Sequence, residues 1–233
     1  MPRQLECEYY MTIEPMIPVI AAAPKRPVHD VTSRRVAINT LLSSSCNNLP
    51  DMDDVKEIEY QFTTKDGQNL SIYFHQKKTS QTFGGLTSAI HYCHGGGMIL
   101  GGVQIYRGAL INYTSNTGVP FFAAEYRVAP QHPHPTPVED CYAGLLWLQE
   151  HHKDFNIVLS RVGVMGDSAR GGLAAGVALM ARDCGLSPPL AKQILIYPML
   201  DDRTTTPDKT IEQLVSWSYD DNITGWTALL GQK

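Results

Sequence analysis

The chain has 233 residues, of which 43% are hydrophobic and 18% are charged, and its net charge is −4. This composition supports a sizeable core and excludes wholesale disorder, and the lack of a basic surface argues against a nucleic-acid partner. No apolar run approaches the ~20 residues that a membrane-spanning helix requires, so we expect no membrane span.

Five cysteines are scattered along the chain without any Cys-x-x-Cys pair. An odd, dispersed set favours free thiols in a reducing compartment over a disulfide framework or a zinc site. The start of the chain carries Glu6 and Glu8, where a secretion signal would be basic and then apolar. We therefore predict a cytoplasmic protein with no bound metal.

Residues 1–54 have weak periodicity and many prolines, and we expect one short helix over Val31–Leu42. We interpret this stretch as an N-terminal extension, part of a cap, that packs onto the rest of the molecule. Its boundary is set by the alternating pattern that begins after residue 54.

Two alternating segments follow the extension. Ile58, Tyr60 and Phe62 form one apolar face, and the pattern repeats over residues 70–75 after a turn signal at Asp66–Gly67. Two such segments around an Asp-Gly turn predict an antiparallel β-hairpin.

Beyond Gly85 the apolar runs are short and lie between helix-length segments, as is typical of strands buried on both faces of a parallel sheet. Apolar stripes predict helices over Pro137–His151 and Leu173–Cys184. A hairpin followed by alternating strands and helices predicts an α/β fold with a mostly parallel, doubly wound sheet. The predicted strands are Ser88–Cys93, Val119–Tyr126, Arg161–Met165 and Gln193–Tyr197.

The core is thus expected over residues 55–200, and residues 201–233 form a further segment. This segment opens with a polar loop, and Thr206 with Pro207 predicts a helix that runs to Ser218. A second short helix is expected over Ile223–Leu230.

Three consecutive glycines follow the strand Ser88–Cys93, in the segment His94–Gly97. Glycines leave backbone N–H groups uncovered, and such donors can stabilise the oxyanion of a tetrahedral intermediate. A flexible connector is the alternative interpretation. A nucleotide-binding loop is disfavoured because no Lys-Ser/Thr pair follows and Leu100 replaces the third glycine of the dinucleotide pattern.

Ser168 lies between the strand Arg161–Met165 and the following helix, within Gly166–Ala169. A serine at a sharp strand-to-helix turn has the geometry of a nucleophile elbow, in which the next backbone N–H completes the oxyanion hole. An ordinary helix-capping serine is the alternative. Both clusters follow parallel strands, whose carboxyl ends form the edge at which ligands bind in open α/β sheets.

With these motifs the chain resembles the hormone-sensitive-lipase-like branch of the α/β-hydrolases, which includes bacterial and fungal carboxylesterases and arylacetamide deacetylases. The resemblance covers residues 57–198, and residues 201–231 are similar to the family's cap insertion. The segments that carry it are Tyr92–Gly97, Glu125–Pro130, Gly166–Ala169 and Ile196–Pro198.

The resemblance implies an α/β-hydrolase fold with a partial helical cap, a small-molecule ester as substrate and no cofactor. It implies Ser168 as the nucleophile and Gly96, Gly97 and Ala169 as oxyanion donors. Further residues that support the motifs are His94, Gly95, Gly166 and Asp167. Trp217 and Trp226, in the cap segment, could roof the site.

The chain departs from the family in its catalytic base. The α/β-hydrolase order is serine, acid, histidine, but all eight histidines precede Ser168. The family's acid and histidine lie on two later strands that this chain does not reach, so we expect the last two strands to be absent. An incomplete sheet would leave an open edge, through which copies of the chain could form a homo-oligomer.

Arg170 is the second departure, because the elbow pattern has glycine two residues after the nucleophile. We expect its guanidinium either to reach solvent or to push the helix outward, and hence to impair the elbow. The favoured interpretation is a serine hydrolase of carboxylic esters with reduced activity. The alternatives are a non-catalytic small-molecule binder, like the plant gibberellin receptors of this branch, and an inactive fragment.

Overall fold

The computed structural model describes residues 7–22, 24–47, 49, 52–79 and 85–231. The sequence-based expectation about the chain's first residues therefore falls largely outside the described part. Six strands form one sheet, in the order β1-β2-β4-β3-β5-β6. The strands are β1 (Val55–Thr63), β2 (Asn69–Lys77), β3 (Thr87–Cys93), β4 (Phe121–Ala124), β5 (Ile157–Asp167) and β6 (Lys192–Ile196).

The sheet is mixed, as the sequence predicted. β1 and β2 pair antiparallel around the turn at Gly67, and β2 continues antiparallel onto β4. β4, β3, β5 and β6 are parallel neighbours. The prediction of an α/β fold with an antiparallel N-terminal hairpin and a mostly parallel sheet is thus confirmed.

The helices agree with the sequence patterns in part. α5 and α6 occupy the predicted positions, α3 continues past Leu42, and α7 begins four residues before Ile223. α4 was not predicted, because it buries only Leu110, Ile111 and Thr114 and so has a weak apolar stripe. The helices are α1 (Cys7–Ile13), α2 (Ile17–Ala22), α3 (Val31–Asn47), α4 (Arg107–Thr117), α5 (Thr136–Glu150), α6 (Ala169–Asp183) and α7 (Tyr219–Leu230), with 3-10 turns η1 (Glu14–Met16), η3 (Val103–Tyr106) and η4 (Glu212–Leu214).

The predicted helix from Thr206 to Ser218 is wrong, since only the short η4 forms within it. Local side-chain bonds compete with helix formation here. The Asp208 carboxylate accepts hydrogen bonds from both the backbone N–H (3.0 Å) and the hydroxyl (2.6 Å) of Thr210. Ser218 instead caps α7, where it exchanges hydrogen bonds with Asp221 in a capping box.

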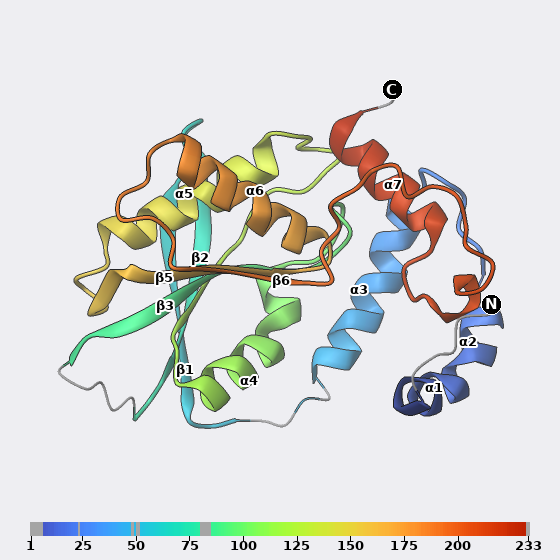
Figure 1. The fold of residues 1–233 in the computed structure, drawn as a ribbon, viewed down its shortest axis with the longest axis horizontal. Coiled ribbons are helices and arrows are strands. Elements are labelled where there is room, and N and C mark those ends of the chain that lie inside the picture. The colour runs from blue at the N-terminus through green and yellow to red at the C-terminus, as the bar shows by residue number, and fades with distance from the viewer. Residues whose placement is uncertain (1–6, 23, 48, 50–51, 80–84, 232–233) are drawn as a thin grey trace.

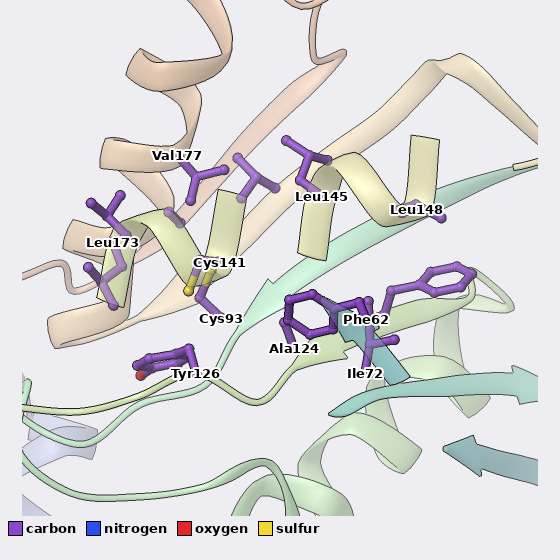
Figure 2. Packing of buried hydrophobic residues seen from close by; sticks show 14 of the residues in the cluster. Phe62, Ile72, Cys93, Ala124, Tyr126, Cys141, Leu145, Leu148, Leu173 and Val177 are labelled. Atoms are coloured by element: carbon purple, nitrogen blue, oxygen red, sulfur yellow. The ribbon is translucent and has the colours of Figure 1, made fainter. Parts of the chain in front are cut away.

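Helices cover both faces of the sheet, with α5 and α6 on one face and α4 on the other (Figure 1). Side chains alternate accordingly along β3: Ala89 and Cys93 join the core beneath α5 and α6, whereas Tyr92 joins the core beside α4. Figure 2 shows the first core, in which Leu145 of α5 and Val177 of α6 face the sheet. Within the described residues, no helix is long and apolar enough to cross a membrane.

The segments at the two ends of the chain meet beside the sheet, where α3 lies next to α7 (Figure 1). A buried ion pair joins them, with Arg34 Nε 2.7 Å from Asp221 Oδ1. Arg34 also donates to the carbonyls of Pro27 (2.6 Å) and Asp30 (3.0 Å), which satisfies its guanidinium. α3 and α7 belong to residues 1–54 and 201–233, whose assignment as two cap segments stays a prediction.

Candidate active site

The first component of the site is the segment after β3, residues 94–101, which we call the glycine loop. Gly96 and Gly97 have φ angles of +131° and +58°, a region that favours glycine. The N–H groups of Ile99 and Leu100 donate to Gly96 O at 3.2 and 3.0 Å, which closes the loop into a compact turn. The glycine loop is therefore an ordered turn, and the flexible connector is not what the chain forms here.

Ser168 lies at the junction between β5, which ends at Asp167, and α6, which begins at Ala169. Its φ of +56° and ψ of −125° are rare for a residue with a side chain, and such strain persists only where the surroundings impose it. Neighbouring backbone holds it: Ser168 N–H donates to Ile196 O, and Met199 N–H donates to Ser168 O, both at 2.9 Å. The side chain makes no capping hydrogen bond, so the helix-cap interpretation does not account for this serine.

The glycine loop and Ser168 leave the same edge of the sheet. β3 and β5 are parallel neighbours, and Cys93, the last residue of β3, pairs with Gly166. A Cβ added to Gly95 would lie 2.8 Å from Asp167 Oδ2, so the two segments are in direct contact. The structure thus brings together the loop and the turn that the sequence singled out, although the catalytic roles of their residues stay predictions.

Asp167 is buried next to Ser168 and accepts a hydrogen bond from the Tyr92 hydroxyl at 2.7 Å. Burial raises the pKa of Asp167 above its usual range and raises that of Tyr92 well above 10.0. Among the described residues, no ion pair joins Asp167 to Arg127. Arg127 binds Asp140 and Asp66 instead, each with an N···O distance of 2.7 Å.

His94 lies fully buried beneath the loop and stacks on the Tyr126 ring, with centroids 4.4 Å apart. The Tyr126 hydroxyl donates to His94 O at 3.0 Å. Burial, followed by the nearby Arg170 charge, lowers the pKa of His94 well below 6.5, so the imidazole is neutral. Its Nε2 lies 3.7 Å from Glu125 Oε1. The buried His94 side chain therefore supports the rest of the glycine loop, residues 95–101.

Arg170 neither reaches solvent nor stands clear of the loop. Its side chain is fully buried and runs from α6 to the glycine loop, where Nη2 donates to Leu100 O at 2.5 Å. The guanidinium carbon lies 4.8 Å from the centroid of the Tyr126 ring. Nε and Nη1 have no hydrogen-bond partner, and burial lowers the pKa of Arg170 to about 10. The charge is thus stabilised by one carbonyl, one aromatic face and the nearby Glu125 carboxylate.

Three further histidines have polar contacts away from Ser168. His75 lies 2.7 Å from Glu57, and the ring nitrogens of His151 and His152 contact the backbone oxygens of Trp147 and Ile157. Among the described residues, no hydrogen bond joins a histidine to Ser168.

Several residues that contact the glycine loop escaped the sequence analysis. Arg35 of α3 donates to Ile99 O at 2.6 Å, and Asn39 Oδ1 accepts from Gly101 N–H at 3.1 Å. No sequence pattern marks Arg35 or Asn39, because each forms its hydrogen bond with a backbone group more than 60 positions away in sequence. Trp217 was considered as a roof for the site, and it packs directly on Gly97.

Comparisons with known proteins agree with this geometry. A family model described as the alpha/beta hydrolase fold matches residues 90–233. Esterase LipI from Mycobacterium tuberculosis is 38% identical over 107 residues, which are 46% of this chain and 33% of that protein. Arylacetamide deacetylase from Bos taurus is 31% identical over 166 residues, which are 69% of this chain and 40% of that protein. The matched region therefore spans less than half of each relative.

A solved structure extends the comparison to nearly the whole chain. A bacterial heroin esterase superposes with a TM-score of 0.80 at 30% identity, covering 96% of this chain and 70% of that one. The motif segments around Ser168 and the glycine loop lie inside the region that the family model matches. The chain therefore belongs to the α/β-hydrolase family, in the branch that resembles hormone-sensitive lipase.

Proposed function

We propose that the chain binds small carboxylic esters and that Ser168 attacks their carbonyl carbon. The backbone N–H groups of Gly96, Gly97 and Ala169 would hold the oxyanion that forms. In the reaction the Ser168 Oγ–C bond forms, the ester C–O bond breaks, and the alcohol leaves with a proton. Water then hydrolyses the acyl-serine to a carboxylic acid. The esterases among the chain's relatives support this substrate class.

The observation that carries the proposal is the backbone of Ser168. A half-buried serine with φ +56° stands at a strand-to-helix turn, and its neighbour Asp167 contacts a loop that contains three consecutive glycines. The start of α6 adds the partial positive charge of a helix N-terminus where negative charge would develop. A strained residue that surrounding structure maintains is typical of active sites.

Among the described residues, no hydrogen bond links Ser168 to a histidine that could take its proton. No histidine follows Ser168, and His94 lies beneath the loop as a buried, neutral ring. Oxyanion donors and binding alone leave roughly 10³–10⁴-fold acceleration over water when triad members are removed. We therefore expect slow turnover of activated esters, with the proton passing to water.

A second candidate function is non-covalent binding of a small molecule at the same site. The lack of any histidine bonded to Ser168 among the described residues favours it. The same site would then hold a ligand without cleaving it.

A fluorophosphonate probe separates the two candidates. The probe forms a bond between Ser168 Oγ and phosphorus and releases fluoride, and mass spectrometry of the peptide that contains Ser168 detects the adduct. We expect time-dependent labelling of the native chain, and none in Ser168→Ala or in the denatured chain. Absence of labelling together with saturable binding of an ester analogue, measured by calorimetry, would replace the hydrolase proposal with the binding one.

A further inference from the structure

The indole of Trp217 lies directly on the glycine loop. A Cβ added to Gly97 would overlap Cη2 and Cζ2 of the indole and would lie 2.7 Å from Cζ3. The ring therefore occupies the space that a side chain at position 97 would need. Trp217 comes from the segment after β6, 120 positions away in sequence, so the contact is purely tertiary.

Helix α7 reaches the same residue through a second glycine. A Cβ added to Gly225 would lie 2.5 Å from Gly97 O and 3.6 Å from Trp217 Cζ2. Only glycine at both positions allows this approach of backbone to backbone. Gly97 thus contacts both the indole ring and the α7 backbone.

Trp217 is itself fixed by its neighbours in the chain. The next residue, Ser218, forms the capping box with Asp221, with hydrogen bonds of 2.9 and 3.1 Å. Asp221 also binds Arg34 of α3, at 2.7 Å. The loop's far end is tied to the same helix, because Arg35 and Asn39 bind Ile99 and Gly101. The α3–α7 region therefore contacts the glycine loop at its middle, through Gly97, and at its far end, through Ile99 and Gly101.

We propose that Trp217 is a positioning residue, which sets the direction of the Gly97 N–H toward the carbonyl oxygen above Ser168. This inference rests on the proposed function, since it concerns the oxyanion donor of that reaction. A donor must lie within hydrogen-bond distance of the developing oxyanion, and a misplacement of about 1 Å can cost on the order of 100-fold in rate. The segment 201–231 would then serve as a support for the catalytic backbone as well as a cover for the site.

The test compares three variants of the full chain. Trp217→Ala removes the ring, and Trp217→Phe keeps a smaller aromatic ring that does not extend as far as the indole atoms on Gly97; the indole Nε1 that is also lost has no hydrogen-bond partner. Trp147→Ala is the matched control, because Trp147 of α5 packs against Tyr60 and Phe155, at centroid distances of 5.5 and 5.9 Å. Two quantities are measured: the rate of Ser168 labelling by the fluorophosphonate, and hydrogen exchange in the peptide covering residues 94–101.

For Trp217→Ala we expect labelling at least about 10-fold slower, with the probe's binding constant unchanged, and faster exchange in residues 94–101. Trp217→Phe should give values between those of Trp217→Ala and the parent, because its shorter ring only partly fills the space beside Gly97. Trp147→Ala should change neither value even where it lowers the melting temperature. Labelling and loop exchange that stay at the parent values in Trp217→Ala would overturn the inference. If the parent itself is not labelled, the proposed function fails, and loop exchange alone then decides whether Trp217 positions Gly97.

Discussion

Arg170 lies two residues after Ser168, and its guanidinium is buried between the glycine loop and the Tyr126 ring. Among the described residues, no ion pair includes it. Desolvation of an unpaired cation costs free energy, and the lowered pKa of Arg170 has the same cause. The structure therefore supports a loss of stability caused by burying the Arg170 charge. The outward displacement of the helix that the sequence suggested is not needed to explain this loss.

Arg170→Met should raise the free energy of unfolding by about 1–3 kcal/mol, because methionine fills the same space without a charge. Arg170→Gly should gain less, since it leaves a cavity beside Leu100. Chemical denaturation measures both, with Arg170→Lys as the variant that keeps a charge. A methionine variant that unfolds more easily than the parent would show that the guanidinium is a net stabiliser.

Asp167 gives a pH-dependent prediction. Burial raises the pKa of Asp167 in the folded state above 3.8. The contribution of Asp167 to stability is therefore fully present below its pKa in the unfolded state. It is lost as the pH rises through its pKa in the folded state. Asp167→Asn keeps an acceptor for the Tyr92 hydroxyl but carries no charge. We expect it to be more stable than the parent at pH 7, on the order of 1 kcal/mol, and to lose this advantage below about pH 4. Melting curves across that range test this, and an unchanged difference at all pH values would contradict it.

At the scale of elements, Arg127 joins three parts of the fold. It lies in the loop after β4, contacts Asp140 of α5 through Nε (2.9 Å) and Nη2 (2.7 Å), and reaches Asp66 in the hairpin turn. The Asp140 side chain is only 1% exposed, so it depends on this partner, whereas the Asp66 side chain is 55% exposed.

Arg127→Met should lower the free energy of unfolding by about 3–5 kcal/mol, because it leaves the Asp140 carboxylate buried and unpaired. Asp66→Asn is the matched control and should cost far less, since water replaces the lost contact. Urea denaturation of both variants provides the comparison. Equal losses of stability for the two variants would mean that the contact with the exposed Asp66 contributes as much as the contact with the buried Asp140.

Elements with a strong apolar period were the ones that the sequence predicted well. The β1–β2 hairpin, β3, α5 and α6 lie within a few residues of their expected bounds, because each has one face, or two, buried in the core. The sequence analysis missed α4 and wrongly predicted a helix from Thr206, because neither segment has a strong apolar period. Both segments are mostly polar, so tertiary contacts and local side-chain bonds decided their conformation.

At the scale of the whole molecule, β6 forms an edge of the sheet as far as the described residues extend. Its side chains Lys192, Gln193 and Ile194 are exposed, and it borders a groove lined by Leu179, Leu186 and Leu190. An exposed edge strand can pair with another chain. The homo-oligomer that the sequence suggested stays a prediction, and this edge is where we place it.

We expect the chain to associate in a concentration-dependent manner through β6. Ile194→Lys puts a charge into the edge and should shift the population toward monomers, as measured by size-exclusion chromatography with light scattering. Leu146→Lys, at a similarly exposed position on α5, is the control and should leave association unchanged. A parent that stays monomeric at high concentration, or an Ile194→Lys variant that associates equally well, would rule out pairing through this strand.

The sequence by itself determined the fold class, the hairpin, the parallel strands and the two motif segments, because each depends on local periodicity or on short runs of glycine and serine. It also placed both motifs after strands, which was enough to expect them at one edge of the sheet. Only the tertiary structure decided which groups surround them: Tyr92 beneath Asp167, Tyr126 beneath Arg170, and Trp217 upon Gly97. These contacts join positions 44 to 120 residues apart in the sequence, and no local pattern encodes a pairing over that distance.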